Sequence, residues 1–126
     1  MPVIIAVDFD GTLVEHQYPA IGPDVPGAFE WLHKLKGAGA LLMLWTMRDG
    51  GHLAEAVEHC ADRGITFWGV NQNPGQASWS QSVKQYAHLY IDDAALGCPL
   101  VLRKAARAYV DWTVAGPLAL AVVDCG

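Results

Sequence analysis

The chain has 126 residues, of which 52% are hydrophobic and 17% charged, so it is long enough for one domain with its own core. Thirteen acidic and eight basic residues give a net charge of -5, which argues against a general surface for binding nucleic acid. The longest apolar run near the end, residues 112–123, is shorter than the roughly 20 residues that cross a bilayer. We therefore expect a single domain over residues 1–126 that has no membrane partner.

The compartment is predicted from the cysteines and from the start of the chain. Cys60, Cys98 and Cys125 are odd in number and have no paired spacing, which favours reduced thiols over a disulfide framework. The first apolar run lacks preceding basic residues and breaks at Asp8, so it does not resemble a signal peptide. Both observations predict a cytoplasmic protein.

Short apolar runs alternate with helical patterns in the first half of the chain. Residues 3–7 are unbroken and rich in β-branched side chains, as in a strand that is buried on both faces. The pattern then predicts, in chain order, a helix between Asp24 and Gly37 or Gly39, a strand over 41–45, a helix over 51–63 and a strand over 65–68.

The second half begins with a polar stretch, residues 69–80, that predicts a loop. It is followed by a predicted short helix over 81–86, a strand over 88–91, a short edge strand over 99–102 and a partly helical tail beyond Trp112. Strands that alternate with helices at this spacing indicate crossover units and a parallel sheet. The predicted fold class is α/β.

Polar side chains directly follow three of these strands. Asp8 and Asp10 come after the first, Thr46 after the second, and Asp92 and Asp93 after the fourth. Because reactive groups of parallel sheets gather at the carboxyl ends of the strands, we expect these side chains to meet at one edge. Carboxylates placed this closely repel one another unless a cation lies between them, and oxygen ligands without His or Cys favour Mg²⁺ over zinc.

Such a site suits phosphoryl transfer, because an aspartate can act as a nucleophile and form an acyl-phosphate. The turn at Gly11 and Thr12 is expected to aim backbone N–H groups at an anion. The hydroxyl of Thr46 and the ammonium group of Lys84 are expected to bind phosphoryl oxygens from the other side.

Four segments resemble, in order, the motifs of the haloacid dehalogenase-like (HAD) hydrolase superfamily. Asp8–Thr12 resembles the first motif, and Leu42–Thr46, a hydrophobic strand that ends in Thr, resembles the second. Lys84 is similar to the lysine of the third motif, and Tyr90–Asp93 resembles the fourth. The resemblance covers roughly residues 3–112. It implies a Rossmann-like three-layer sandwich and a phosphatase.

The resemblance also implies a role for each matched residue. Asp8 would be the nucleophile and Asp10 the general acid and then the base, while Thr46 and Lys84 would orient the phosphoryl group. The presence of Asp10 favours a phosphatase, because dehalogenase members generally lack the second aspartate of the first motif.

The implied metal is Mg²⁺, bound by Asp8, the backbone carbonyl of Asp10, and Asp92, with Asp93 helping directly or through water. The intervals from Asp10 to Thr46 and from there to the third motif are too short for a cap domain. The chain therefore resembles small capless members, whose open sites a partner, a loop or a neighbouring subunit of a homo-oligomer covers.

Four further residues have open roles. Arg48 lies two residues after the second motif, and it either binds the phosphate or the leaving group or forms a surface ion pair. His16 and Tyr18 lie in the loop that acts as a flap in the family, where contact with substrate and packing against the loop are both open. Trp79 either stacks on a ring or anchors its loop.

The sequence also allows one alternative metal site and two alternative functions. His52, Glu55 and His59 share a helix face and could form a zinc site, but the pattern lacks a fourth ligand, so a solvated face is preferred. The expected substrate is a small phosphate ester. A non-catalytic phosphate-binding or assembly module and a polynucleotide-end phosphatase are the alternative functions, although the acidic balance counts against the latter.

Overall fold

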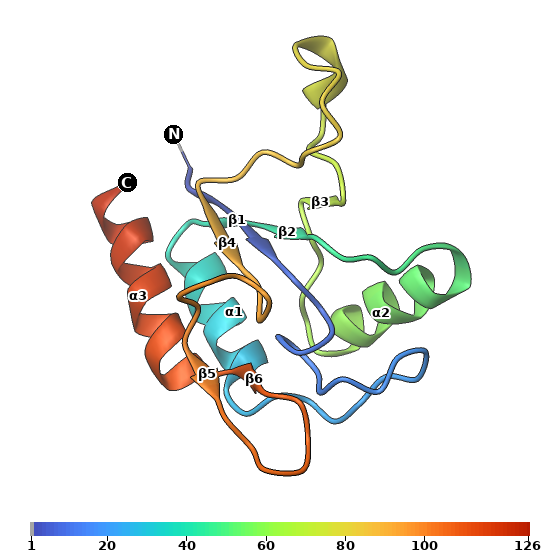
Figure 1. Cartoon of the computed structure of the whole chain (residues 1–126). Coiled ribbons are helices and arrows are strands. Elements are labelled where there is room, and N and C mark those ends of the chain that lie inside the picture. The colour runs from blue at the N-terminus through green and yellow to red at the C-terminus, as the bar shows by residue number, and fades with distance from the viewer. Residues whose placement is uncertain (1) are drawn as a thin grey trace.

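A computed structural model describes residues 2–126 and shows an α/β fold (Figure 1). The predicted class and the central parallel sheet are confirmed. The elements are, in chain order, β1 (Ile4–Val7), α1 (Ala28–Gly37), β2 (Leu41–Leu44), α2 (Gly50–Asp62), β3 (Gly69–Val70), the 3₁₀ turn η1 (Gln76–Ser78), β4 (Leu89–Ile91), β5 (Leu100–Val101), β6 (Tyr109–Val110) and α3 (Trp112–Cys125).

Four strands form the central sheet in the order β3-β2-β1-β4, and all of them are parallel. Val7, the last residue of β1, pairs with Leu44 of β2 on one side and with Ile91 of β4 on the other. The chain moves outward from β1 to β3 and then returns to the opposite side of β1 for β4. The carboxyl ends of β1 and β4 therefore flank the topological switch point, where open α/β sheets bind their ligands.

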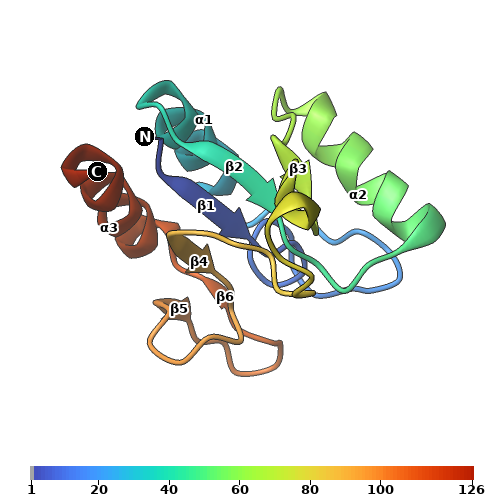
Figure 2. The ribbon, with the colours of Figure 1, turned by 90° about the horizontal axis from the view of Figure 1, so that it is seen from above.

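The two faces of the sheet are covered differently (Figure 2). Ile5 and Val7 point into the larger core, which contains buried side chains from α1, α2 and α3. Ile4 and Ala6 point to the opposite face, whose smaller core cluster includes no helix residue within residues 2–126. Ala87, from the segment between β3 and β4, packs on that second face. The predicted three-layer sandwich thus has one helical layer and one thin layer of irregular chain.

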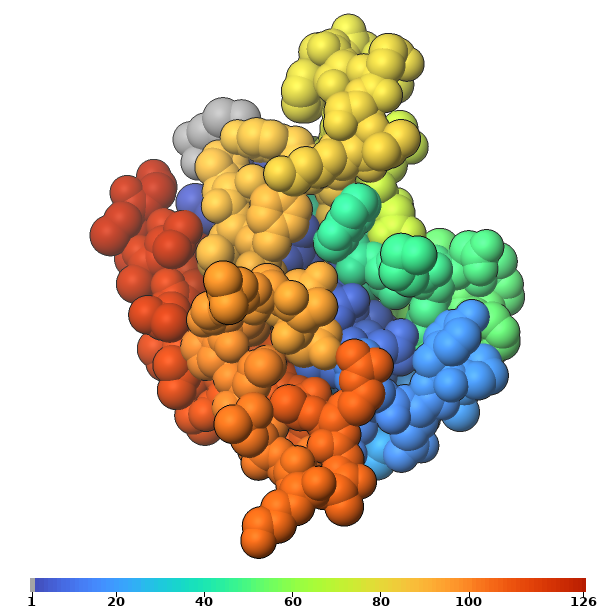
Figure 3. Space-filling model, viewed as in Figure 1, coloured from blue at the N-terminus to red at the C-terminus, as the bar shows by residue number. Residues whose placement is uncertain are grey.

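The segment between β3 and β4 also stands out from the body of the molecule, as the yellow part of Figures 1 and 3 shows. Its predicted short helix over 81–86 is absent, and this prediction is wrong. The hydroxyl of Ser80 accepts from the N–H of Ser82 at 3.1 Å, and the hydroxyl of Ser82 accepts from the N–H of Lys84 at 3.1 Å. Serine side chains that bind nearby N–H groups in this way compete with helix formation.

The third strand forms later in the chain than the predicted range 65–68. Gly64 has φ of 80° and ends α2, and the N–H of Ile65 still donates to the carbonyl of Cys60 at 3.0 Å. Hydrogen bonding to the sheet begins only at Trp68, whose N–H donates to the carbonyl of Leu42 at 2.8 Å. The first residue of the predicted strand therefore belongs to the hydrogen bonding at the end of α2, and the strand begins later in the chain.

The last part of the chain is more regular than predicted. α3 runs without interruption from Trp112 to Cys125, although it contains Pro117. Gly116 of α3 lies so close to the ring of Trp31 in α1 that a Cβ atom has no room there. The predicted strand over 99–102 forms as β5, but it pairs with β6 in a separate antiparallel sheet of two strands. No helix within residues 2–126 combines the length and apolar composition of a membrane span.

Candidate active site

The structure brings three of the predicted acidic residues together at the switch point. Carboxylate oxygens of Asp8, Asp92 and Asp93 all lie within 4.8 Å of one another. Asp8 directly follows β1, and the other two directly follow β4, which is the neighbouring strand. All three side chains are partly buried. Within residues 2–126 no other group of His, Cys, Asp or Glu side chains is close enough to hold a metal ion.

Thr12 connects the two loops that carry these acids. Its side-chain hydroxyl donates to Asp8 Oδ2 at 3.2 Å and accepts from the N–H of Asp93 at 3.3 Å. Its carbonyl accepts from the indole N–H of Trp112 in α3 at 2.8 Å, and Thr12 itself is fully buried. Thr12 therefore fixes the acidic residues relative to each other and to the helical layer.

The expected role of Gly11 and Thr12 in binding an anion through backbone N–H groups is not what the structure shows. The N–H of Gly11 donates to the carbonyl of Val14 at 2.7 Å, and that of Thr12 donates to the carbonyl of Phe9 at 3.2 Å. Both groups are therefore engaged inside the turn. Gly11 instead has φ of 85° and allows the side chains of His16 and Asp93 to approach its Cα, where a Cβ would collide with them.

The carboxyl group of Asp8 is strongly perturbed. Burial raises its pKa from 3.8 to about 9, and the hydrogen bond with Asp93 and the negative charges of Asp92 and Asp93 act in the same direction. A hydrogen bond from the backbone of Phe9 opposes this shift. In the absence of a cation, Asp8 therefore keeps a proton at neutral pH, and a divalent cation among these oxygens would take the place of that proton.

Asp10 does not join this cluster through its side chain, because Arg48 binds it. Arg48 Nε donates to Oδ2 and Nη2 donates to Oδ1 of Asp10, both at 2.8 Å. The remaining guanidinium donors reach the carbonyls of Pro19 at 3.2 Å and Ala20 at 2.9 Å. Arg48 is only 2% exposed. Of the two roles left open for Arg48, the structure shows the ion pair, but it is buried rather than on the surface, and it holds Asp10 and the loop before α1.

Thr46 follows β2, whereas Lys84 lies in the irregular segment before β4. The Thr46 hydroxyl accepts from the N–H of Arg48 at 3.1 Å, which leaves the hydroxyl proton free to donate. The Lys84 ammonium group lies 5.3 Å from the ring centre of Tyr90. Tyr90 packs on the thinly covered face of the sheet, so the ammonium group of Lys84 lies on that face.

The residues whose roles the sequence left open also have definite contacts. His16 Nε2 lies 2.8 Å from Asp93 Oδ2. The exposed ring of Tyr18 lies 5.1 Å from the Arg48 guanidinium group. Trp79 packs edge-to-face against Tyr86 with a centroid distance of 6.1 Å. His16 is thus the one of these three residues that contacts the acidic cluster.

The alternative zinc site on α2 does not form. His59 Nε2 is 2.7 Å from Asp24 Oδ1, and the imidazole ring packs against Phe9 with a centroid distance of 5.9 Å. His52 Nδ1 is 3.6 Å from Glu55 Oε1. The two histidines therefore have separate partners, as expected for a face that does not bind metal.

Two residues at this edge were missed by the sequence analysis. Asn71 follows β3 and its side-chain oxygen accepts from the N–H of Thr46 at 2.8 Å. The almost fully buried amide of Gln85 is oriented so that its oxygen accepts from the N–H groups of Asn71 and Gln72, at 3.2 Å each. A polar residue directly after a strand is the signal that would have found Asn71, but the predicted strand ended at Trp68.

Comparison with known proteins gives one clear relative. A solved structure, described as that of a conserved protein coded by a locus from Bacteroides thetaiotaomicron, is 36% identical to this chain and superposes with a TM-score of 0.81. The match covers 97% of this chain and 93% of the other. The chain belongs to the same family as that protein. The Bacteroides protein confirms the fold, and its description states no activity. No protein-family model and no curated protein matches the chain.

Proposed function

We propose that the protein is a Mg²⁺-dependent phosphomonoester hydrolase of the HAD type, which forms an aspartyl-phosphate on Asp8. The observation that carries this proposal is the group of three carboxylates within 4.8 Å of one another at the topological switch point. So many negative charges in a partly buried site are unfavourable without a cation. The order of the four sequence motifs supports the same conclusion.

The donor set fits Mg²⁺. All ligating atoms are carboxylate or carbonyl oxygens, which hard divalent cations prefer. In this proposal Asp8, Asp92 and the backbone carbonyl of Asp10 hold the ion, and Asp93 helps directly or through water. When bound, the ion supplies positive charge that screens the phosphate from the carboxylates.

The covalent chemistry is assigned to Asp8 and Asp10. A carboxylate oxygen of Asp8 attacks phosphorus, the bond from phosphorus to the ester oxygen breaks, and Asp10 gives its proton to that oxygen. Asp10 then removes a proton from water, the water oxygen attacks the phosphorus of the aspartyl-phosphate, and inorganic phosphate leaves with Asp8 restored. Because Arg48 holds both oxygens of Asp10, one of these contacts has to open before Asp10 can reach the leaving group.

Thr46 and Lys84 are proposed to hold the phosphoryl oxygens. The Thr46 hydroxyl has its proton available because it already accepts from Arg48. The ammonium group of Lys84 lies 5.3 Å from the ring centre of Tyr90, two residues before Asp92 in the sequence. A neutral donor and a cation on two sides of the phosphoryl group would stabilise the charge that spreads over its oxygens in the transition state.

The test is turnover of an aryl phosphate by the wild type and by Asp8→Asn and Asp10→Asn. We expect wild-type activity that requires Mg²⁺ and is abolished by a chelator, and no activity in Asp8→Asn. With an activated phosphate donor, Asp10→Asn should accumulate an adduct of about 80 Da, visible by intact-mass spectrometry at low pH. Undiminished turnover in excess chelator, or an adduct on Asp8→Asn, would contradict the proposal.

A second candidate is a non-catalytic phosphate-binding module on the same scaffold. It is favoured by the hydrogen bonds from Arg48 to both oxygens of Asp10. Asp10 is the proposed general acid, and these bonds engage the oxygens that it would use. A module of this kind would bind inorganic phosphate in the presence of Mg²⁺ but would not turn over any phosphate ester, so the same assay separates the two functions.

A further inference from the structure

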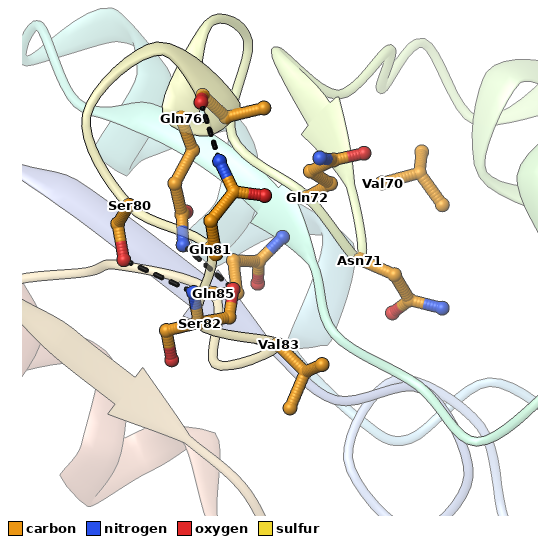
Figure 4. Close-up of a pocket in the computed structure, with 10 residues that line it drawn as sticks. Val70, Asn71, Gln72, Gln76, Ser80, Gln81, Ser82, Val83 and Gln85 are labelled. Carbon is orange, nitrogen blue, oxygen red and sulfur yellow. Dashed lines mark hydrogen bonds between the residues drawn. The ribbon is translucent and has the colours of Figure 1, made fainter.

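A pocket of about 400 Å³ lies between the chain that leaves β3 and the chain that returns toward β4 (Figure 4). Its volume falls within the range of small-molecule sites, roughly 300–1,000 Å³. Asn71 lines the pocket and also accepts from the N–H of Thr46 at 2.8 Å. Asn71 thus connects the pocket to the backbone of Thr46, a residue of the proposed phosphate site.

The sheet sets the separation between the pocket and Asp8. β1, β2 and β3 are adjacent, and neighbouring strands are about 4.8 Å apart, so the ends of β1 and β3 are roughly 10 Å apart. Asp8 follows the first of these strands and Asn71 follows the third. A substrate whose phosphate lies at Asp8 therefore has the rest of its structure within reach of this pocket.

The lining of the pocket is polar and neutral. Among the described residues that line it, none is charged and none is aromatic. The polar members are Asn71, Gln72, Gln76, Ser80, Gln81, Ser82 and Gln85. Figure 4 shows that they come from both sides of the pocket, the first two from the stretch after β3 and the others from η1 and the returning chain.

These amides divide into supporting groups and free groups. Gln76 Nε2 donates to the carbonyl of Lys84 at 2.8 Å, and Gln85 is buried against the backbone, so both hold the segment together. In contrast, Asn71 Nδ2, the whole amide of Gln72 and Gln81 Oε1 have no hydrogen-bond partner within residues 2–126. The pocket therefore presents unused donors and acceptors side by side.

This chemistry matches hydroxyl groups, because each hydroxyl both donates and accepts a hydrogen bond. It does not match a nucleobase, which would need an aromatic face for stacking, since Trp79 and Tyr86 pack against each other outside this lining. It also does not match a second phosphate or a carboxylate, because the lining has no basic side chain. We propose that the pocket binds the leaving group of the substrate, and that this group is a neutral polyol or sugar.

This inference rests on the proposed phosphatase function and names its substrate class. The experiment compares kcat/KM for a hexose 6-phosphate with that for phenyl phosphate, which carries the same phosphoryl group but no hydroxyls. The variants are Gln72→Leu and Gln81→Leu, both at exposed positions. Ser78→Ala is the matched control, because Ser78 is exposed on the same segment but does not line the pocket.

We expect the wild type to prefer the hexose phosphate by at least about tenfold, since an unpaired polar group in a site disfavours the ligand that lacks its partner. Each glutamine variant should lose about tenfold in kcat/KM for the hexose phosphate and keep its value for phenyl phosphate. Ser78→Ala should change neither. Equal wild-type values for both substrates, or an equal loss on both in the variants, would overturn the pocket assignment and leave the phosphatase proposal standing.

Binding is measured separately by calorimetric titration of the inactive Asp8→Asn protein, with and without Gln72→Leu, with each compound in the presence of Mg²⁺. Tighter binding of the hexose phosphate that is lost in Gln72→Leu supports the pocket assignment, and equal binding of both compounds refutes it. The absence of Mg²⁺-dependent turnover of either compound would refute the phosphatase proposal instead. The two failures are therefore distinguishable.

Discussion

Replacing Asp8 by Asn should stabilise the cation-free protein while it abolishes the proposed chemistry. The Asp8 carboxyl has its pKa raised from 3.8 to about 9, chiefly by burial and then by Asp93 and Asp92. Between these two pH values the folded state keeps a proton that the unfolded state releases. The free energy of unfolding therefore falls as the pH rises through this window.

The size of the effect follows from the same shift. Each pH unit above 3.8 lowers the free energy of unfolding of the wild type by up to 1.36 kcal/mol. At neutral pH the loss is therefore at most about 4 kcal/mol. Because Asp8 is partly exposed, solvent screens part of this effect, and we expect about 1–3 kcal/mol. Asn has the same shape as Asp but does not ionise, so its burial carries no pH-dependent cost. The Asp8→Asn variant should therefore unfold at a melting temperature roughly 3–10 °C higher than the wild type in excess chelator at neutral pH.

The assays are thermal and urea unfolding of both proteins in chelator and in saturating Mg²⁺, from mildly acidic to mildly alkaline pH. The difference should shrink toward acidic pH, and Mg²⁺ should stabilise the wild type more than the variant, because a ligand that binds only the folded state raises its stability. Asp62→Asn, an exposed aspartate at the end of α2, is the control and should show neither effect. If Asp8→Asn is no more stable than the wild type in chelator, or if its advantage does not depend on pH, the reasoning about this carboxyl is wrong.

Two further predictions concern the residues around the cluster. Arg48→Lys keeps the positive charge but loses the bidentate contact with Asp10, so the free energy of unfolding measured in urea should fall by about 1–3 kcal/mol. An unchanged free energy of unfolding would show that the contact contributes nothing to stability. His16→Ala removes the partner of Asp93 and should weaken Mg²⁺ affinity, measured by calorimetry, about 10–100-fold, whereas unchanged affinity would place His16 outside the site.

The strands that position the site could be predicted because their sequences leave few alternatives. β1 is buried on both faces, and its apolar run ends where Asp8 enters the partly buried edge. β4 is only partly buried at Leu89 and Tyr90, but its apolar run likewise ends where Asp92 enters this edge. The rule that parallel strands place their carboxyl ends at one edge was therefore sufficient to bring these acids together, even though they are far apart in the sequence.

The partner of Asp10 could not be predicted in this way. Thirty-eight residues separate Asp10 from Arg48, and neither the charge pattern nor the spacing indicates that a guanidinium group lies buried between two loops. The position of Arg48 just after a strand suggested contact with substrate. The structure shows that the carbonyls of Pro19 and Ala20 complete its hydrogen bonding, and these come from a loop whose path no local pattern specifies.

The irregular layer between β3 and β4 explains why so many amide side chains gather beside the proposed site. A helix there would satisfy its own backbone groups, whereas irregular chain needs side-chain partners for them. Asn73 is one, since its amide donates to the carbonyl of Tyr86 at 2.7 Å and accepts from the same residue's N–H at 2.9 Å. Gln76 is another, through the carbonyl of Lys84.

The composition that predicts a loop in the sequence therefore has two consequences in the structure. Buried amides such as Asn73 and Gln76 fix the path of the segment, so the walls of the pocket are held in place by their own hydrogen bonds. Exposed amides such as Gln72 are not required for this support and keep their polar atoms free. A rigid wall with free amides on its surface is what selective binding of hydroxyl groups requires, because the ligand then does not have to order the chain that binds it. The absence of a helix on this face thus leaves the site open and, in our proposal, also supplies the surface that selects its substrate.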